Sequence, residues 1–163
     1  MTAFVIRAPR HDEAEQLAEL HLLTWQETYG GIFPPSAWGD EARAQRLAMW
    51  GFFCTRPRPT DRIAVAERDG RLIGFAGSGE NTDEPSDSRR ILFFIYTLGS
   101  EHGSGAGQAL LDAVIGTESV CLWVLEANPR ARAFYERNGF ALDGARQGTG
   151  FDTGGDEVRM VRR

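Results

Sequence analysis

The sequence predicts a mixed α/β fold in which helices flank a central sheet. Two near-continuous runs of aliphatic and aromatic residues, Ile91–Leu98 and Val120–Leu125, have the composition of central strands covered on both faces. A glycine-rich turn and an apolar stripe at helical spacing lie between them, and a second helical stripe follows the second run. This order of strand, turn, helix, strand and helix indicates a layered α/β domain.

The N-terminal third of the chain predicts one strand and two helices. Phe4–Ala8 is short and apolar, as expected of an edge strand. Asp12, with Glu15 three residues later, has the pattern of a capping box, and apolar residues then recur at helical spacing. A second helix is expected over Glu41–Trp50, between a Pro-Pro pair and the RPRPT stretch.

The middle of the chain predicts a hairpin, a loop and a helix. Ile63–Arg68 and Leu72–Gly77 are separated by Asp-Gly, which is typical of a tight two-residue turn. The polar stretch Gly79–Arg90 contains Pro and Ser and is expected to be a loop. After the glycine turn Gly103–Gly107, a helix is expected to run to Ile115.

The last third predicts a capped helix and a hairpin. Asn128 is a good N-cap, Pro129 suits the first helical position, and Asn138-Gly139 marks the helix end. Phe140–Gln147 and Glu157–Arg162 are expected to form the closing strands.

Composition limits the classes of protein to consider. The 163 residues, 42% of them hydrophobic and 25% charged, suit one domain over residues 1–163. A formal charge of −5 argues against a nucleic-acid partner, which needs a basic surface. No apolar run reaches the roughly 18 residues of a membrane helix, and the N-terminus does not resemble a signal peptide. We therefore expect a cytoplasmic protein with no membrane partner.

Two cysteines, Cys54 and Cys121, carry no metal or redox pattern. They are far apart and neither belongs to a CxxC pair, so no disulfide framework or zinc site is predicted. Both are expected to be plain buried thiols, and no metal is implied.

The glycine turn carries the first chemical signal. Backbone N–H groups can approach a phosphate closely where side chains lack bulk, and a helix start adds positive dipole. Gly103, Gly105 and Gly107 meet that requirement. Taken alone, the pattern fits a flexible surface turn equally well.

The stretch HGSGAGQALL, followed by LWVLEANPRARAFYERNGF, resembles the acetyl-CoA-binding signature of GNAT N-acetyltransferases. The opening FVIRAPRHDEAEQLAELH, the segment TWQETYGGIFP and the closing GFALDGARQ and DEVRMVRR are similar to one common bacterial branch, so the resemblance spans nearly the whole chain. It implies a mostly antiparallel central sheet with a splayed strand pair that forms the acyl-CoA cleft.

The signature departs from the family pattern at two places. The family begins Q/R-x-x-G-x-G/A with Gln or Arg, whereas this chain has His102, and Gly99 replaces a Pro that is usual a few residues earlier. A histidine donates a hydrogen bond to a phosphate but carries charge only when protonated, so binding is expected to depend on pH. The alternative is an exposed loop histidine.

The resemblance implies which residues bind acetyl-CoA. The main chain of Ile95 and Thr97 would pair with the pantetheine arm, because alternate N–H groups of a strand point the same way. Asn128 would contact the arm, although it also reads as a helix cap. The remaining cofactor contacts implied are His102, Gly103, Ser104, Gly105, Ala106, Gly107, Gln108 and Tyr135.

The resemblance also implies a general acid, Tyr135, whose phenol would protonate the departing thiolate. On periodicity alone Tyr135 reads as a core aromatic beside Phe134. No acid lies in the strand ILFFIYTL, where many relatives have one. The base is therefore a bound water or one of three weak candidates that read equally as surface carboxylates, Glu27, Glu80 and Glu126.

The acceptor is expected to be a small-molecule or peptide amine. Trp25, Tyr29 and Trp38 either line its pocket or pack in the core. The resemblance is compatible with a homodimer. Two other readings are a non-catalytic acyl-CoA-binding module and a dinucleotide-binding oxidoreductase, and the second fails because Gln108 stands where the sixth position of GxGxxG requires glycine.

Overall fold

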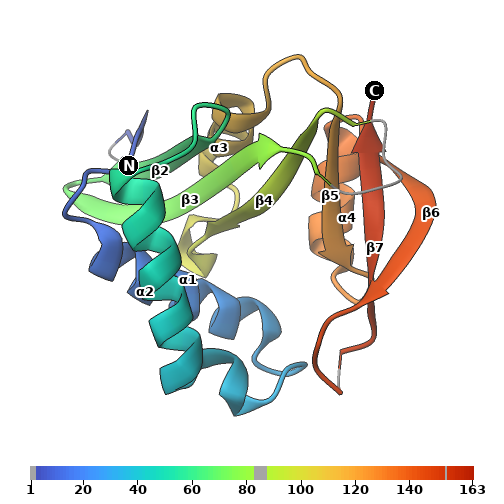
Figure 1. The fold of residues 1–163 in the computed structure, drawn as a ribbon, viewed down its shortest axis with the longest axis horizontal. Helices are drawn as coiled ribbons and strands as arrows, with labels where there is room; N and C mark the ends of the chain where they lie inside the picture. Colours follow the sequence, from blue (N-terminus) through green and yellow to red (C-terminus); the bar gives the residue numbers. More distant parts are fainter. Residues whose placement is uncertain (1–2, 83–87, 153) are drawn as a thin grey trace.

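The computed structural model describes residues 3–82, 88–152 and 154–163. These residues form a seven-stranded sheet in the order β1-β2-β3-β4-β5-β7-β6 (Figure 1). The helices and strands, in chain order, are β1 Val5–Arg7, α1 Ala14–Tyr29, η1 Pro35–Trp38, α2 Asp40–Thr55, β2 Arg62–Arg68, β3 Arg71–Glu80, β4 Arg90–Thr97, η2 Gly99–Glu101, α3 Ala106–Ile115, β5 Val120–Leu125, α4 Pro129–Arg137, β6 Ala141–Gly148 and β7 Asp156–Arg162.

The strand pairing is antiparallel except at one place in the middle of the sheet. β1 to β4 pair antiparallel in sequence order, and β7 pairs antiparallel with both β5 and β6. β4 and β5 are parallel, and their register covers just three residue pairs, from Arg90 with Val120 to Leu92 with Leu122. Beyond Leu92 the two strands separate. This confirms the predicted α/β class, with a mostly antiparallel sheet and a splayed central pair.

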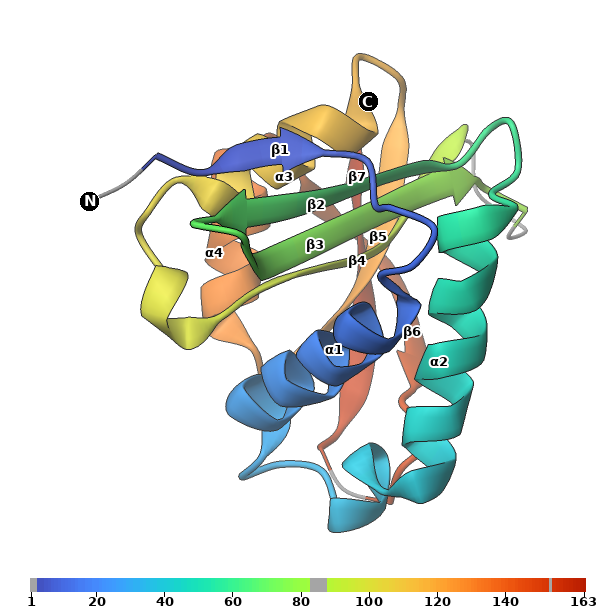
Figure 2. The same cartoon turned by 90° about the vertical axis from the view of Figure 1, so that its left-hand side faces the viewer.

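Helices cover both faces of the sheet (Figure 2). α1 and α2 pack on one face, where Leu17 and Trp50 join Val65 and Phe75 in a core. α3 and α4 cover the other face, where the larger core includes their buried apolar residues and residues of β2, β3, β4, β5 and β7. Burial on both faces explains the near-continuous apolar sequence of the two central strands.

Most local signals are confirmed. Asp69 and Gly70 have φ of 52° and 75°, the left-handed values that a type I′ turn between β2 and β3 requires. Asn128 Oδ1 accepts a hydrogen bond from Ala131 N at 3.2 Å, so Asn128 caps α4 as predicted. The C-terminal strands form the expected hairpin, and β1 lies at the edge of the sheet.

The predicted start of the first helix is wrong. The N-cap is Glu13 and not Asp12, and no side-chain capping bond forms there. The Glu13 carboxylate instead accepts Arg10 N at 2.8 Å and pairs with the Arg7 guanidinium at 2.6 Å, so β1 is tied to α1. A charge-assisted contact to a neighbouring strand outcompetes the local capping box.

Other boundaries also differ. α2 continues five residues past Trp50, because Phe53 beyond it still packs in the core. Cys121 is buried as expected, but Cys54 on α2 is half-buried. β3 extends to Glu80 and β4 begins at Arg90, so the loop predicted over Gly79–Arg90 is shorter than expected, and its residues 83–87 lie outside the described part.

Among the described residues, no helix combines the length and the apolar character needed to cross a membrane.

Candidate active site

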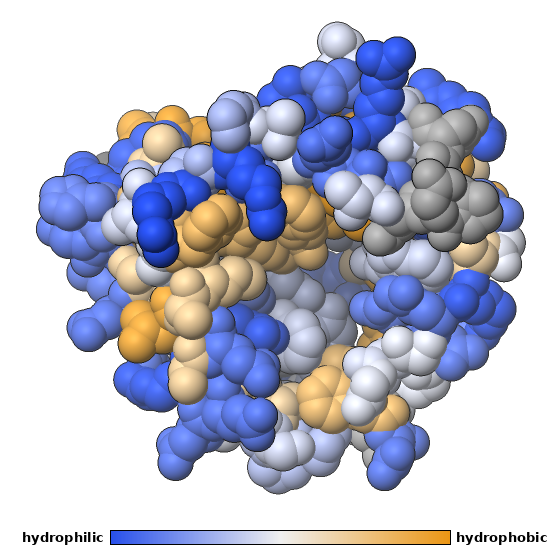
Figure 3. Space-filling view, in the orientation of Figure 1, coloured by the Kyte–Doolittle hydropathy of each residue, from blue (hydrophilic) through white to orange (hydrophobic). Residues whose placement is uncertain are grey.

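A cleft of about 1070 Å³ opens where β4 and β5 separate. α1 and the residues after it line one side, the segment around the glycine turn lines one end, and β5, α4 and the β6–β7 connection line the other side. Figure 3 shows the hollow near the centre of the face that is seen in Figure 1. The cleft therefore lies at the carboxyl ends of the two parallel strands, where open α/β sheets commonly bind ligands.

A bulge in β4 accompanies the separation. Gly77 pairs with Phe94 but the next residue, Ser78, pairs with Leu92, so Phe93 is an extra residue that is 39% exposed. Bulges bend a strand and increase its twist. β4 therefore turns away from β5 and leaves its own edge open to the cleft.

The open edge of β4 presents backbone groups to the cleft. Leu98 N donates to Ile73 O of β3 at 2.9 Å. Because hydrogen-bonding directions alternate along an antiparallel ladder, the N–H groups of Tyr96 and Phe94 also point toward β3. The N–H groups of Ile95 and Thr97 then point the other way, into the space between β4 and β5, where the sequence analysis expects an extended ligand to pair.

The glycine turn forms a cradle of free backbone amides. Gly103 and Gly105 have φ of 84° and 91°, which side-chain-bearing residues rarely adopt. In the described part of the chain, the amides of Gly103, Gly105, Gly107 and Gln108 have no hydrogen-bond acceptor. A Cβ on Gly107 would meet nothing within 4 Å. Several N–H groups at the start of α3 are therefore available to an anion.

Two residues of the predicted phosphate site do not line the cleft. Ser104 Oγ accepts Ala106 N at 3.2 Å, and the Ala106 side chain is fully buried in the core below α3. Both residues hold the turn in shape, whereas Ile95, Thr97, His102, Gly103, Gly105, Gly107, Gln108, Asn128 and Tyr135 line the cleft.

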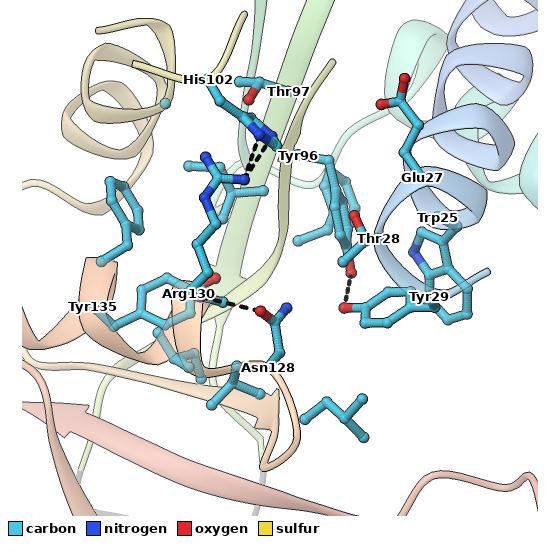
Figure 4. A pocket seen from close by; sticks show the side chains of 18 of the residues that line it. Trp25, Glu27, Thr28, Tyr29, Tyr96, Thr97, His102, Asn128, Arg130 and Tyr135 are labelled. Atoms are coloured by element: carbon cyan, nitrogen blue, oxygen red, sulfur yellow. Dashed lines mark hydrogen bonds between the residues drawn. The ribbon is translucent and has the colours of Figure 1, made fainter. Parts of the chain in front are cut away.

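His102 lies beside a cation that sequence reasoning missed. Arg130, on the first turn of α4, directs its guanidinium at the imidazole of His102 across the cleft (Figure 4), with Nη1 2.9 Å from Nε2. Partial burial and the Arg130 charge lower the pKa of His102, while the Glu27 carboxylate opposes this. The lasting positive charge at the cradle therefore belongs to Arg130. Its position one residue after the Pro of a capped helix was the available signal.

Tyr135, also on α4, directs its hydroxyl into the cleft from the side opposite α1 (Figure 4). The residue is 8% exposed, and burial raises the pKa of its hydroxyl, which stays protonated at neutral pH. No hydrogen bond to this hydroxyl occurs among the described residues. It is thus a buried donor without a protein acceptor.

A pair of tyrosines faces Tyr135. The hydroxyls of Tyr29 on α1 and Tyr96 on β4 lie 2.9 Å apart. Burial raises the pKa of both groups, and each is close enough to the other to affect it. Three protonated phenols therefore surround the point where β4 and β5 separate.

The three acids considered as general base lie in different settings. Glu27 lines the cleft, and its Oε2 accepts Gly99 N at 2.9 Å. Glu126 forms a salt bridge with Arg146 at 2.6 Å, and this hydrogen bond lowers the pKa of Glu126. Neither Glu126 nor Glu80 lines the cleft. Glu157 of β7 does line it, and no sequence signal pointed to that residue.

Of the three aromatic residues expected near the acceptor, two line the cleft and one does not. Trp25 and Tyr29 line the cleft from α1, with ring centroids 5.1 Å apart. Trp38 packs against the same aromatic cluster but lines a separate hollow together with Leu23 and Arg43.

Comparisons with known proteins identify the family and support the fold. Residues 15–140 match the model of the acetyltransferase (GNAT) family. A probable N-acetyltransferase of Mycobacterium tuberculosis is 27% identical over 150 residues, which cover 85% of this chain and 80% of that protein. An uncharacterized N-acetyltransferase of the same species is 32% identical over 61% of this chain and 64% of its own length. The PaiA N-acetyltransferase of Thermoplasma acidophilum, solved with coenzyme A, is 18% identical and has a similar fold, with a TM-score of 0.71 over 99% of both chains.

Proposed function

The chain belongs to the acetyltransferase (GNAT) family, and from this premise we propose that it is an N-acetyltransferase that moves an acetyl group from acetyl-CoA to an amine. The open edge of β4, which runs directly into the amide cradle at α3, carries this proposal. The N–H groups of Ile95 and Thr97 suit an extended amide-containing arm, and the cradle suits a pyrophosphate. The two lie in sequence along one cleft.

The charges in the cleft support the same ligand. Arg130 supplies a permanent cation where a phosphate would lie, and the amides of Gly103, Gly105, Gly107 and Gln108 supply donors. Gly107 leaves open space beside its Cα, so a ligand can approach the backbone closely. His102 adds a second, pH-dependent donor.

Acetyl-CoA supplies the acetyl group as a thioester, and the acceptor nitrogen attacks its carbonyl carbon. A backbone N–H of the open β4 edge, at Ile95 or Thr97, stabilises the negative charge that develops on the carbonyl oxygen. As the C–N bond forms and the C–S bond breaks, the Tyr135 hydroxyl gives its proton to the leaving sulfur. Tyr135 regains a proton from water, and the nitrogen releases its surplus proton to solvent. The products are an amide and a free thiol.

Thermal unfolding tests whether acetyl-CoA binds the folded protein. A ligand that binds the native state alone stabilises by about 2.7 kcal/mol at a concentration 100 times its Kd. We expect acetyl-CoA to raise the Tm and NAD or NADP to have little effect. Stabilisation by a dinucleotide without stabilisation by CoA would contradict the proposal.

Release of free thiol in the presence of amines tests the reaction. The alternative considered from the sequence, a non-catalytic acyl-CoA-binding module, would show the thermal shift without thiol release. The chain offers a clean background because it contains 18 arginines and no lysine. Acetylation of a lysine side chain of the protein itself therefore cannot mimic turnover.

A further inference from the structure

One half of the cleft has a composition that the acetyl donor does not explain. We call it the acceptor half. It lies on the face of the sheet that α1 covers, opposite α3 and α4. The residues that define it are Trp25, Tyr29, Phe33, Tyr96, Phe151 and Glu157.

Aromatic rings form the walls of the acceptor half. The rings of Tyr29 and Phe33 lie 5.0 Å apart, and those of Phe33 and Phe151 lie 4.8 Å apart at an interplanar angle of 33°. Trp25 packs edge-on against Tyr29. The rings come from α1, the segment after it and the β6–β7 connection, so two separate parts of the chain form one aromatic wall. Such a wall favours an aromatic or other apolar group over a polar one.

The carboxylate of Glu157 faces these rings. Glu157 of β7 pairs in register with Leu125 of β5, and Leu125 packs against Tyr29 and Phe33. Burial raises the pKa of Tyr29, the Tyr96 hydrogen bond opposes this, and the Glu157 charge raises the pKa again. Glu157 Oε2 accepts Gln147 Nε2 at 2.8 Å. In the described part of the chain, Oε1 of Glu157 has no partner and remains available.

The cations that line the cleft lie outside the acceptor half. Of the described residues that line the cleft, they are Arg130 and Arg137 of α4, with His102 beside the glycine turn. Arg159, two residues after Glu157, is paired with Asp143 at 2.7 Å. Arg46 does not line the cleft, although its Cζ lies 4.6 Å from the ring centroid of Trp25 and its charge acts on Tyr96 behind the wall. A carboxylate in the acceptor half would therefore meet Glu157 and could form no direct ion pair with a described residue that lines this half.

We propose that the acceptor is a primary amine carried on an aromatic or similarly flat apolar group, with no carboxylate beside the amine. The inference rests on the proposed acetyl transfer. The ammonium form is attracted to the Glu157 carboxylate and the electron-rich ring faces, and the apolar group packs against Phe33 and Phe151. Amino acids are rejected because their carboxylate is repelled and loses its hydration.

The transfer balances for such a substrate. The ammonium gives one proton to water in the open cleft, and the neutral nitrogen then attacks the thioester carbon. A second nitrogen-bound proton is lost after the C–N bond forms. One proton is taken up by the thiol through Tyr135, so each amide formed releases one proton to solvent.

Four amines test the substrate class without altering the protein. We expect 2-phenylethylamine and phenylalaninamide to be acetylated with kcat/KM at least about tenfold above that of phenylalanine, because the phenylalanine carboxylate would be repelled by Glu157. Ethanolamine, which lacks the ring, should be similarly poor. Thiol release is the measurement. Equal or faster turnover of phenylalanine or ethanolamine would overturn the inference and leave the proposed function intact.

A charge-neutral variant tests Glu157 itself. Glu157→Gln should raise KM for 2-phenylethylamine and reduce the discrimination against phenylalanine. Glu41→Gln, which removes an exposed carboxylate on α2, is the matched control and should change neither value. An unchanged ratio in a Glu157→Gln protein with normal CoA binding would contradict the role of Glu157. Absence of both thiol release and CoA stabilisation would instead overturn the proposed function and this inference together.

Discussion

The guanidinium of Arg130 and the imidazole of His102 meet across the mouth of the cleft, although 28 residues separate them in the sequence. Arg130 Nη1 donates to the imidazole, so two side chains that can both bind a phosphate lie together beside the glycine turn. Burial and the nearby cation lower the pKa of His102 and favour its neutral form. An anion bound at the glycine turn would favour the protonated form instead.

Replacing Arg130 is expected to weaken acetyl-CoA binding through the phosphates. A hydrogen bond to a charged group contributes about 1.5–3 kcal/mol, so KM for acetyl-CoA should rise roughly tenfold to a hundredfold in Arg130→Ala. Acetyl-pantetheine, which lacks the phosphates, should react equally well with both proteins. Arg132→Ala on the same helix, at a position outside the cleft, is the control. A folded Arg130→Ala protein with an unchanged KM would remove Arg130 from the site.

His102 is expected to make acetyl-CoA affinity depend on pH. The pKa of His102 is lowered in the free chain, and a bound pyrophosphate raises it. Affinity is therefore highest below the free-state pKa and is lost as pH rises through the bound-state pKa. Titration calorimetry between pH 5 and 8 should show this trend, and His102→Ala should flatten it. The placement is wrong if His102→Ala leaves both the affinity and its pH dependence unaltered.

Tyr135→Phe is expected to lower turnover far more than it weakens CoA binding. The substitution keeps the ring that packs in the core and removes only the hydroxyl. General acid catalysis contributes about a hundredfold or more, and kcat should fall by that factor if loss of the thiolate limits the rate. The Kd for CoA and the Tm, measured on the same protein, separate chemistry from packing. A normal kcat in a well-folded Tyr135→Phe protein would show that Tyr135 is a core aromatic.

Lowering the pH should destabilise the fold through His21, at pH values above those at which the carboxylates titrate. His21 is buried among aromatic rings and accepts Trp50 Nε1 at 3.2 Å, and burial, followed by the Arg46 charge, lowers its pKa well below 6.5. The unfolded chain therefore binds a proton that the folded chain does not. Stability is lost as pH falls below the unfolded pKa of about 6.5, by up to about 1.4 kcal/mol per pH unit.

Urea unfolding at pH values from 5 to 8 measures this dependence. His21→Gln keeps a hydrogen-bond acceptor and cannot take up the proton, so the free energy of unfolding should vary less with pH than in the unaltered protein. His11→Gln, which changes an exposed histidine, is the control. Equal slopes for His21→Gln and the unaltered protein would contradict the assignment.

Local sequence signals were accurate where neighbouring residues control the backbone. The Asp-Gly turn between β2 and β3 and the helix that starts at Asn128 depend on φ preferences and hydrogen bonds within a few residues. The capping box at Asp12 failed because Arg7 of the preceding strand engages Glu13 instead. Nothing within the helix sequence indicates that contact.

The glycine turn of the candidate site was predictable for the same reason. Gly103 and Gly105 adopt left-handed φ values that their residue type permits, so short-range backbone preferences determined the turn. Tyr135 and Asn128 line the cleft, but their roles there were implied by the family resemblance, since periodicity alone read Tyr135 as a core aromatic and Asn128 as a helix cap.

Only the tertiary structure decided the charges on the two sides of the cleft. Arg130 meets His102 because the first turn of α4 and the segment after β4 line the same cleft, and Glu157 faces Tyr29 because β7 inserts between β5 and β6. The β4 bulge at Phe93 opens the space between them. Strand order, bulge position and helix docking arise from packing between segments far apart in the chain, and hydrophobic periodicity carries no information about which distant segment a given face will meet.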